Sequence, residues 1–228
     1  IYADGADLKS ILGLNANPLV EGFTTNPTLL RKDGVTDYEG FAKAVLEEVA
    51  KPISFEVFAD EFSEMERQAR IISGWGENVY VKIPITNTKN ESSLPLIQKL
   101  YQEGIKLNIT ALLSTRQVVE LSKILDKDTP TIVSVFAGRI ADTGLDPIPL
   151  IMRARIQLNR NKNVELLWAS PREVLNIYQA QTCKVDIVTC PPEMIEKYQK
   201  LKGKDLEEFS LETVQMFYND GKAAGYTL

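Results

Sequence analysis

The feature that most constrains the fold is an alternation, repeated eight times, of a short apolar run and an amphipathic stretch. Runs rich in β-branched and aromatic residues predict buried strands, because such side chains suit a pleated surface that is covered on both faces. Apolar residues three or four positions apart predict helices, since this spacing places them on one side. Strands are expected at residues 1–3, 20–24, 53–58, 79–85, 107–111, 131–136, 164–169 and 185–189.

Helices are expected between these strands, at residues 6–12, 38–49, 63–73, 94–101, 114–125, 148–159 and 171–179, from Pro192 onward, and at 209–223. A Gly-, Asp- and Pro-rich loop is expected at 138–147. Eight strands, each followed by a helix, predict an α/β fold: one (β/α)₈ TIM-barrel domain over residues 1–228, with an additional C-terminal helix at about 209–223. A doubly wound open sheet is the alternative, but its usual glycine-rich turn after the first strand is missing at Asp4-Gly5-Ala6-Asp7.

Charge and composition exclude several classes of partner. The net charge is −5, and no basic stretch is interleaved with aromatic residues, so neither nucleic acid nor an anionic membrane is expected as a partner. Cys183 and Cys190 form no CxxC motif, and reduced thiols in a cytoplasmic protein are expected. No signal peptide or long apolar span is predicted. A small anionic substrate remains compatible, because a local pair of arginines can bind phosphate.

The chain contains no histidine, which excludes catalysis by Ser-His or Cys-His pairs and metal binding by histidine. Two cysteines are too few for a cysteine-only zinc site, and we find no clustered acidic motif for a carboxylate site. No metal or cofactor is therefore expected. Acid–base chemistry would fall to carboxylates, lysine, tyrosine or water.

Lys82 interrupts the apolar run at residues 79–85, where burial of an unpaired ammonium would be costly. Burial favours the neutral amine, and that amine is the form that makes a Schiff base with a carbonyl substrate. Two simpler interpretations stay open. Lys82 could extend to water from the end of the strand, or it could pair with an acidic residue.

Other polar residues interrupt or end the predicted strands, and in a barrel these strand ends meet at one face. The eighth strand contributes none. We expect a shared pocket formed by Asp4, Thr25, Asn26, Glu56, Lys82, Asn108, Thr110, Ser134, Arg139, Ser170 and Arg172.

Each of these residues also has a structural alternative. Asp4 could cap the helix expected at 6–12, and Asn26 could serve turn formation before Pro27. Glu56 could pair with a lysine of a neighbouring strand. Arg172 lies in the first turn of a predicted helix, which disfavours a cation unless an anion binds there. Caps or loop positions are expected for Asp7, Asp142 and Asp146.

Several segments resemble the strand signatures of the transaldolase family, in order and over nearly the whole chain. They are Thr24-Thr25-Asn26-Pro27-Thr28-Leu29, Ser54-Phe55-Glu56-Val57, Val81-Lys82-Ile83-Pro84, Asn108-Ile109-Thr110, Ser134-Val135-Phe136-Ala137-Gly138-Arg139-Ile140 and Ala169-Ser170-Pro171-Arg172. The length is similar to that of the small subfamily that also contains fructose 6-phosphate aldolase.

The resemblance implies catalytic roles for four residues. Lys82 is similar to the lysine that forms a Schiff base with the ketose. Asp4 corresponds to the acid–base carboxylate that takes the proton from the C4 hydroxyl. Glu56 and Thr110 correspond to the pair that holds a water used in proton transfer. The family requires no cofactor.

The resemblance also implies substrate-binding residues and an activity. Contacts to the dihydroxyacetone part would come from Asn26, Asn108 and Ser134, and contacts to the phosphate from Arg139, Ser170 and Arg172. The implied activity is that of a transaldolase of the pentose phosphate pathway, acting on sugar phosphates. Family resemblance further suggests a homo-oligomer. An aldolase that releases free dihydroxyacetone, and a non-catalytic sugar-phosphate binding protein, are the alternatives.

A few positions bear on the choice within the family. Glu56, Phe136 and Asn108 resemble the transaldolase pattern, where the aldolase branch has glutamine, tyrosine and a small residue. Val135 departs from a usual proline, and Pro171 stands where an apolar residue more often separates serine from arginine. Pro171 is therefore expected to affect how Arg172 meets the phosphate.

Overall fold

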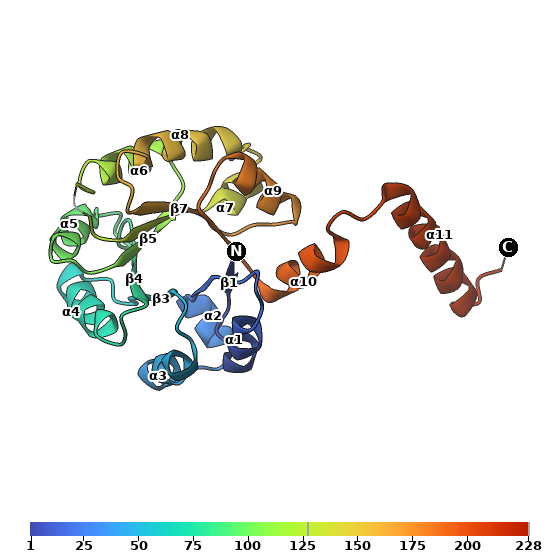
Figure 1. Ribbon diagram of the computed structural model, residues 1–228, viewed down its shortest axis with the longest axis horizontal. Helices are drawn as coiled ribbons and strands as arrows, with labels where there is room; N and C mark the ends of the chain where they lie inside the picture. Colours follow the sequence, from blue (N-terminus) through green and yellow to red (C-terminus); the bar gives the residue numbers. More distant parts are fainter. Residues whose placement is uncertain (127, 228) are drawn as a thin grey trace.

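The computed structural model describes residues 1–126 and 128–227 and has eight parallel strands closed into a barrel inside a ring of helices (Figure 1). Each strand pairs with the next one in the sequence, and β8 (Ile187–Cys190) returns to β1 (Tyr2–Asp4). The other strands are β2 (Gly22–Thr24), β3 (Ile53–Glu56), β4 (Val79–Pro84), β5 (Leu107–Leu112), β6 (Thr131–Val135) and β7 (Val164–Trp168). The predicted TIM barrel is confirmed.

The helices that follow the strands cover the outside of the barrel. They are α1 (Leu8–Asn15), α3 (Tyr38–Glu48), α4 (Phe62–Ser73), α5 (Leu94–Gln102), α6 (Thr115–Ser122), α8 (Ile148–Leu158), α9 (Leu175–Thr182) and α10 (Pro192–Leu201). Local capping sets several of their starts: Asp7 accepts the Ser10 N–H before α1, and Ser114 forms a capping box with Gln117 before α6. Asp7 is thus a cap, as expected.

Two short helices follow strands on the side of the site. α2 (Pro27–Lys32) begins after Asn26, whose side chain accepts the Leu29 N–H. α7 (Ala137–Asp142) occupies the first half of the segment 138–147, so the prediction of a loop throughout that segment is wrong. Glycine and aspartate disfavour a helix, but the burial of Ala137, Gly138 and Ile140 against the barrel outweighs that weak local preference.

The start of α9 also differs from the prediction. The helix was expected from residue 171, but it begins at Leu175. The Asn176 side-chain oxygen accepts the backbone N–H groups of Arg172 and Glu173, and this satisfies two donors ahead of the helix. Pro171 and Arg172 therefore lie ahead of the helix, and Arg172 is not a cation in its first turn.

Two hydrophobic layers frame the barrel. The larger layer fills the space between the strands and the surrounding helices. The smaller one lies inside the barrel and contains Tyr2, Ile132, Leu167, Ala169 and Ile187. Tyr2 packs on Gly22, where any Cβ would lie 2.4 Å from its ring, so only glycine leaves room. Side chains two residues further along these strands reach the open end of the barrel.

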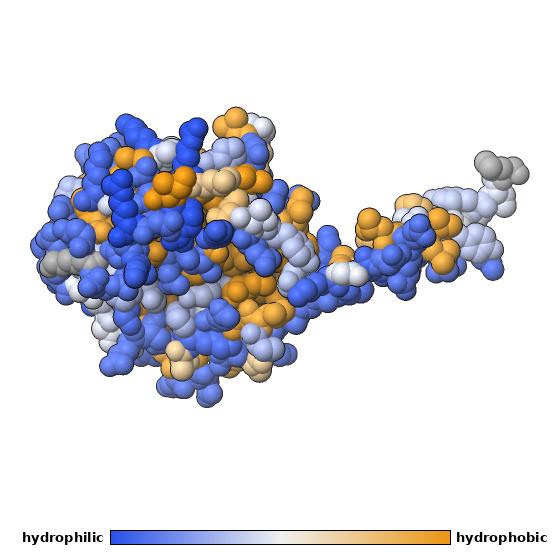
Figure 2. All heavy atoms as spheres, turned by 45° about the horizontal axis from the view of Figure 1, so that its top comes forward, coloured by the Kyte–Doolittle hydropathy of each residue, from blue (hydrophilic) through white to orange (hydrophobic). Residues whose placement is uncertain are grey.

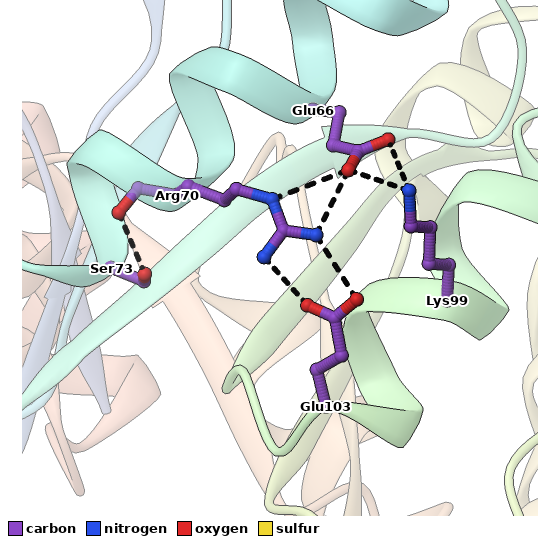
Figure 3. A network of polar contacts seen from close by, with 5 residues as sticks. All are labelled: Glu66, Arg70, Ser73, Lys99 and Glu103. Carbon is purple, nitrogen blue, oxygen red and sulfur yellow. Dashed lines mark hydrogen bonds and ion pairs between the residues drawn. The ribbon is translucent and has the colours of Figure 1, made fainter.

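Charged side chains join two neighbouring outer helices (Figure 3). Arg70 of α4 bonds Glu66 of its own helix and Glu103 just beyond α5, while Lys99 of α5 bonds Glu66. These side chains are partly exposed, so water and salt screen the pairs and each contributes little to stability. The network orients two helices on the outside of the barrel, far from its interior.

The last helix, α11 (Leu206–Ala223), projects away from the barrel beyond α10 (Figure 1). Its start lies three residues before the predicted one, and none of its residues is buried. Large apolar side chains gather on it (Figure 2), with Leu206 and Phe217 exposed to 80% and 65%. One domain over 1–228 therefore stays a prediction for this segment. Among the described helices, none is both long enough and apolar enough to span a membrane.

Candidate active site

The carboxyl ends of the strands surround a cavity of about 560 Å³. This is the face at which TIM barrels carry their active sites. Nine of the ten catalytic and binding residues predicted from the sequence line it: Asp4, Asn26, Glu56, Lys82, Asn108, Thr110, Ser134, Arg139 and Ser170. Arg172 is the exception. Nine of these positions, which come from separate strands and the segments after them, thus lie in one pocket as expected, although their chemical roles stay predictions.

Lys82 lies deep in this pocket and is 6% exposed. Its Nζ donates to the Thr25 backbone oxygen at 2.9 Å and lies 3.0 Å from Glu56 Oε2. Two of its three donors are therefore used. The alternative of a lysine reaching water is wrong, whereas pairing with an acidic residue is confirmed. An amine so held is oriented, and it remains accessible from the cavity.

Asp4 ends β1, and its carboxylate accepts a hydrogen bond from Thr24 Oγ1 at 2.7 Å. It does not cap α1, because Asp7 takes that position. Burial raises the pKa of Asp4 above its usual range, and this outweighs the lowering by nearby Lys82 and by the Thr24 hydrogen bond. A carboxylate of raised pKa beside an amine is suited to taking and returning a proton.

A chain of hydrogen bonds fixes the amide of Asn108. Ser134 Oγ donates to Asn108 Oδ1 at 2.7 Å, and Asn108 Nδ2 donates to Ser54 Oγ at 2.9 Å. All three side chains are buried. Because both ends of the amide are bonded, its orientation is set, and the remaining Nδ2 hydrogen is a preorganised donor. Ser54 lies on β3 two residues before Glu56 and does not line the cavity, so it supports the amide without facing the pocket.

Thr110 stands where β5 departs from regular geometry. The register with β6 shifts between Ile109 and Leu112, and Ala111 adopts a left-handed φ of 62°. Such a backbone costs of order 1–3 kcal/mol for a non-glycine residue and is characteristic of functional sites. The buried Thr110 Oγ1 has no hydrogen-bond partner within the described part of the chain. The irregularity turns an uncompensated hydroxyl toward the pocket.

The start of α7, which follows β6, and the segment that follows β7 approach each other at the rim. A Cβ on Gly138 would lie 1.5 Å from the Ser170 backbone oxygen, so glycine is required for this approach. Ser170 itself has a left-handed φ of 61°. Arg139 of α7 lines the cavity, with its guanidinium carbon 5.5 Å from the centroid of the Phe136 ring. Arg139 and Ser170 therefore sit close together at one end of the pocket.

Arg172 is directed elsewhere. Its Nε donates to Asp142 Oδ1 at 2.9 Å, and its Nη2 bonds the other carboxylate oxygen of Asp142. This bidentate pair lies on the surface and lowers the pKa of Asp142. Asp142, expected as a cap or loop residue, thus has an ion-pair role. A phosphate contact by Arg172 stays a prediction that would require this pair to open.

Two threonines that sequence reasoning did not select also line the cavity. Thr24 lies on β2 and Thr189 on β8, and their hydroxyl oxygens are 2.6 Å apart. The expectation that the eighth strand contributes no polar residue is therefore wrong. Alternation from Ile187, which lies inside the barrel, was the available signal for Thr189.

The comparisons with known proteins identify the family. The family model for transaldolase/fructose-6-phosphate aldolase matches residues 1–227. The chain belongs to this family. A probable transaldolase of Brucella ovis is 35% identical over 211 residues, covering 91% of this chain and 93% of that protein. A probable transaldolase of Maridesulfovibrio salexigens is 32% identical over 212 residues, covering 92% and 95%.

Solved structures of low sequence identity support the fold of this family member. An orotidine 5′-phosphate decarboxylase from Pyrococcus horikoshii superposes with a TM-score of 0.59 at 13% identity, covering 84% of this chain and 89% of that one. A 2-keto 3-deoxygluconate aldolase from Picrophilus torridus gives 0.58 at 12% identity, covering 98% and 82%. At such identities the likeness concerns the barrel alone.

No group of three or more Cys, Asp or Glu side chains that could hold a metal ion occurs within residues 1–126 and 128–227. The two cysteines are buried and unpaired with each other. Burial raises the pKa of Cys190 to about 12, so its thiol is neutral.

Proposed function

We propose that this chain is a transaldolase that transfers a dihydroxyacetone unit between sugar phosphates through a Schiff base on Lys82. The donor would be fructose 6-phosphate or sedoheptulose 7-phosphate, and the acceptor erythrose 4-phosphate or glyceraldehyde 3-phosphate, as in the non-oxidative pentose phosphate pathway. The single observation that carries the proposal is the buried Lys82 amine, held by Glu56 at 3.0 Å in the same cavity as Asp4.

The proposed first half begins at the ketose carbonyl. The neutral Lys82 amine attacks C2, and the resulting carbinolamine loses its hydroxyl as water to give a protonated imine. Glu56 lies next to the amine, and Thr110 has a hydroxyl without a partner among the described residues, so both would move protons through a bound water. Asn108 and Ser134 would hold the hydroxyl groups of the three-carbon unit.

Carbon–carbon cleavage then needs a base and an electron sink. Asp4 takes the proton of the C4 hydroxyl, the C3–C4 bond breaks, and its electron pair moves into the imine to form an enamine on Lys82. The aldose phosphate leaves with the new C4 aldehyde. The acceptor aldose runs these steps in reverse, with Asp4 returning the proton. Arg139 and Ser170 would bind the phosphate at the rim.

The choice of transfer over release rests on site composition. Position 56 is glutamate here, as in the transaldolase pattern, whereas the aldolase branch has glutamine. Position 136 is phenylalanine, which brings no hydroxyl into the cavity that it lines, whereas the aldolase branch has tyrosine. The alternatives remain an aldolase that releases free dihydroxyacetone and a binding protein without turnover. The buried Lys82–Glu56 pair shares its cavity with Asp4, whose pKa is raised by burial, and a carboxyl perturbed in this way inside a cleft favours an enzyme.

Borohydride reduction tests the proposal. The protein is incubated with fructose 6-phosphate, reduced, and analysed by intact-mass and peptide-mapping mass spectrometry. A reduced dihydroxyacetone adduct on Lys82 is expected, and its absence from folded, substrate-saturated protein would refute the Schiff base. Product analysis with and without erythrose 4-phosphate separates the activities: a transaldolase makes sedoheptulose 7-phosphate, whereas an aldolase releases free dihydroxyacetone without an acceptor.

We also propose that a second copy of this chain covers α11, making the protein a homo-oligomer. The helix carries Phe209, Val214, Met216, Phe217 and Tyr218 in exposed positions, while no residue of it is buried. Apolar side chains on this scale normally mark an interface. Exposed apolar residues on the barrel, such as Met152 and Ile156 of α8, offer a surface of the same character.

Light scattering after size-exclusion chromatography measures the assembly. The full chain is expected as an oligomer, and Val214→Asp with Phe217→Asp is expected to shift it toward the monomer. Met216→Asp, on the same helix, maps the extent of the covered face. A full-length protein that is monomeric at micromolar concentration would refute this proposal without touching the catalytic one.

A further inference from the structure

Three neighbouring strands contribute to a chain of two hydroxyl groups that ends on the Asp4 carboxylate. Thr24 Oγ1 of β2 donates to Asp4 Oδ1 of β1 at 2.7 Å. The same Thr24 oxygen lies 2.6 Å from Thr189 Oγ1 of β8. Both threonines are buried, at 2% and 5% exposure. Nothing in the proposed reaction uses Thr189.

Counting protons fixes the direction of this chain. A hydroxyl carries one proton, and an ionised carboxylate only accepts. While Asp4 is ionised, the single proton of Thr24 is given to Asp4, so Thr189 must be the donor to Thr24. Consecutive hydrogen bonds polarise one another, and those that end on a charge are the stronger ones. The terminal donor therefore strengthens the bond that holds the carboxylate.

We propose that Thr189 is a positioning residue for Asp4, acting through Thr24 to fix the carboxylate in its ionised form with Oδ1 bonded and Oδ2 free for the substrate. The inference rests on the proposed role of Asp4 as the base at the C4 hydroxyl. In that step the substrate proton moves to Oδ2. The protonated carboxyl then no longer requires a hydrogen bond from Thr24, and the hydrogen bond between Thr24 and Thr189 can reverse its direction.

Other groups that face Asp4 act separately from this chain. Lys82 of β4 lowers the pKa of Asp4 by its charge, and Glu56 of β3 is paired with Lys82. Cys190 of β8 packs in the hydrophobic layer outside the barrel, and its thiol is neutral because burial raises its pKa to about 12. Lys82, Glu56 and Cys190 make no hydrogen bond to the Thr189 hydroxyl in the described structure, so its removal leaves them in place.

The test is the pH dependence of kcat in Thr189→Val, with Thr189→Ser as the conservative variant and Thr131→Val as the control. Thr131 is a buried strand threonine whose hydroxyl donates to the Thr129 backbone oxygen, outside the site. Loss of the terminal donor is expected to move the acid limb to higher pH. On that limb kcat should fall about 3- to 10-fold, with KM unchanged within about twofold. Thr189→Ser should restore the limb, and Thr131→Val should not move it.

Borohydride trapping with fructose 6-phosphate distinguishes a failure of this inference from a failure of the proposed function. An adduct on Lys82 in wild type and in Thr189→Val, with an unmoved acid limb, overturns the inference and leaves the proposed function standing. A rise in KM with an unmoved limb also overturns it, since that would mean a substrate contact only. No adduct in wild type overturns both. If Thr189→Val does not fold, Thr189→Cys replaces it, because a thiol is a weak donor.

Discussion

Glu56 and Lys82 are direct neighbours across β3 and β4, and the carboxylate Oε2 lies 3.0 Å from the ammonium nitrogen. A lone ammonium at this depth would carry a large desolvation penalty, which the carboxylate offsets. The same register places a proton acceptor beside the amine. This one contact thus explains why a lysine is tolerated in an apolar strand, and it also provides a group that could exchange protons with the amine.

Replacing the lysine gives the first prediction. Lys82→Met should reduce turnover at least about 10³-fold, because Lys82 is the one lysine among the described residues that line the cavity and methionine cannot form an imine. Methionine is similar in length and suits the surrounding strand, so the far-UV circular dichroism should be retained. Activity and borohydride trapping check this. Lys106→Met is the matched control, since Lys106 bonds the Glu77 backbone oxygen outside the cavity. An adduct on another lysine in Lys82→Met would contradict the assignment.

Replacement of Asp4 should have opposite effects on activity, which should fall, and on stability at neutral pH, which should rise. Burial raises the pKa of Asp4 in the folded protein. Its ionised form therefore destabilises the folded state above that raised pKa, and this penalty disappears below the ordinary pKa range of aspartate, where Asp4 is protonated in both states. Asp4→Asn should therefore abolish cleavage while increasing the free energy of unfolding at neutral pH. The gain should shrink as the pH falls, because both states of the wild type then bind the proton. Urea denaturation at several pH values measures this.

Asp60 provides the control of opposite sign. The Thr88 backbone N–H and hydroxyl lower its pKa, so its ionised form favours folding at neutral pH. Asp60→Asn should reduce stability there, with a loss that fades as the pH falls through the lowered pKa. Equal pH trends in both variants would contradict the account of Asp4.

Thr110 tests whether an unpartnered hydroxyl serves catalysis. Thr110→Val removes a buried polar group that has no protein partner among the described residues, so the melting temperature should be unchanged or higher. The gain from removing such a group is about 1 kcal/mol. Turnover should nevertheless fall about 10²-fold if the hydroxyl positions a proton-carrying water. A stable variant with wild-type kcat would remove Thr110 from the mechanism.

The two rim arginines should differ in their effect on phosphate binding. Arg139 lines the cavity, whereas Arg172 is held by Asp142. Arg139→Gln should raise KM for fructose 6-phosphate about 10- to 100-fold, as expected for loss of a charged hydrogen bond. Arg172→Gln should raise it less, because that side chain must first leave its partner.

Unphosphorylated fructose is the matched substrate for this comparison, and its KM should change little in either variant. An equal effect of both arginines would mean that the Arg172–Asp142 pair opens readily when the phosphate binds. An effect of Arg139→Gln on fructose as large as that on fructose 6-phosphate would contradict a role in phosphate binding.

Local patterns determined the barrel and most of its site. The side-chain period of two in strands and the three-to-four spacing in helices are set by backbone geometry, so they can be read directly from the chain. The polar positions Asp4, Glu56, Lys82, Asn108 and Ser134 interrupt or end strands that had to meet at one face. Once the barrel was predicted, their convergence followed without any knowledge of contacts.

Contacts between residues far apart in the sequence determined the features of the site that local sequence patterns could not predict. The partner of Arg172 is an aspartate thirty residues away, and the donor behind Thr24 comes from the opposite end of the sequence. Position 138 requires glycine because the Ser170 backbone oxygen, from the segment after the next strand, lies against it. The chain alone determined which residues face the barrel interior, since that is a local property. Tertiary structure decided which of them bond one another, because closure of the barrel brings β1 and β8 together.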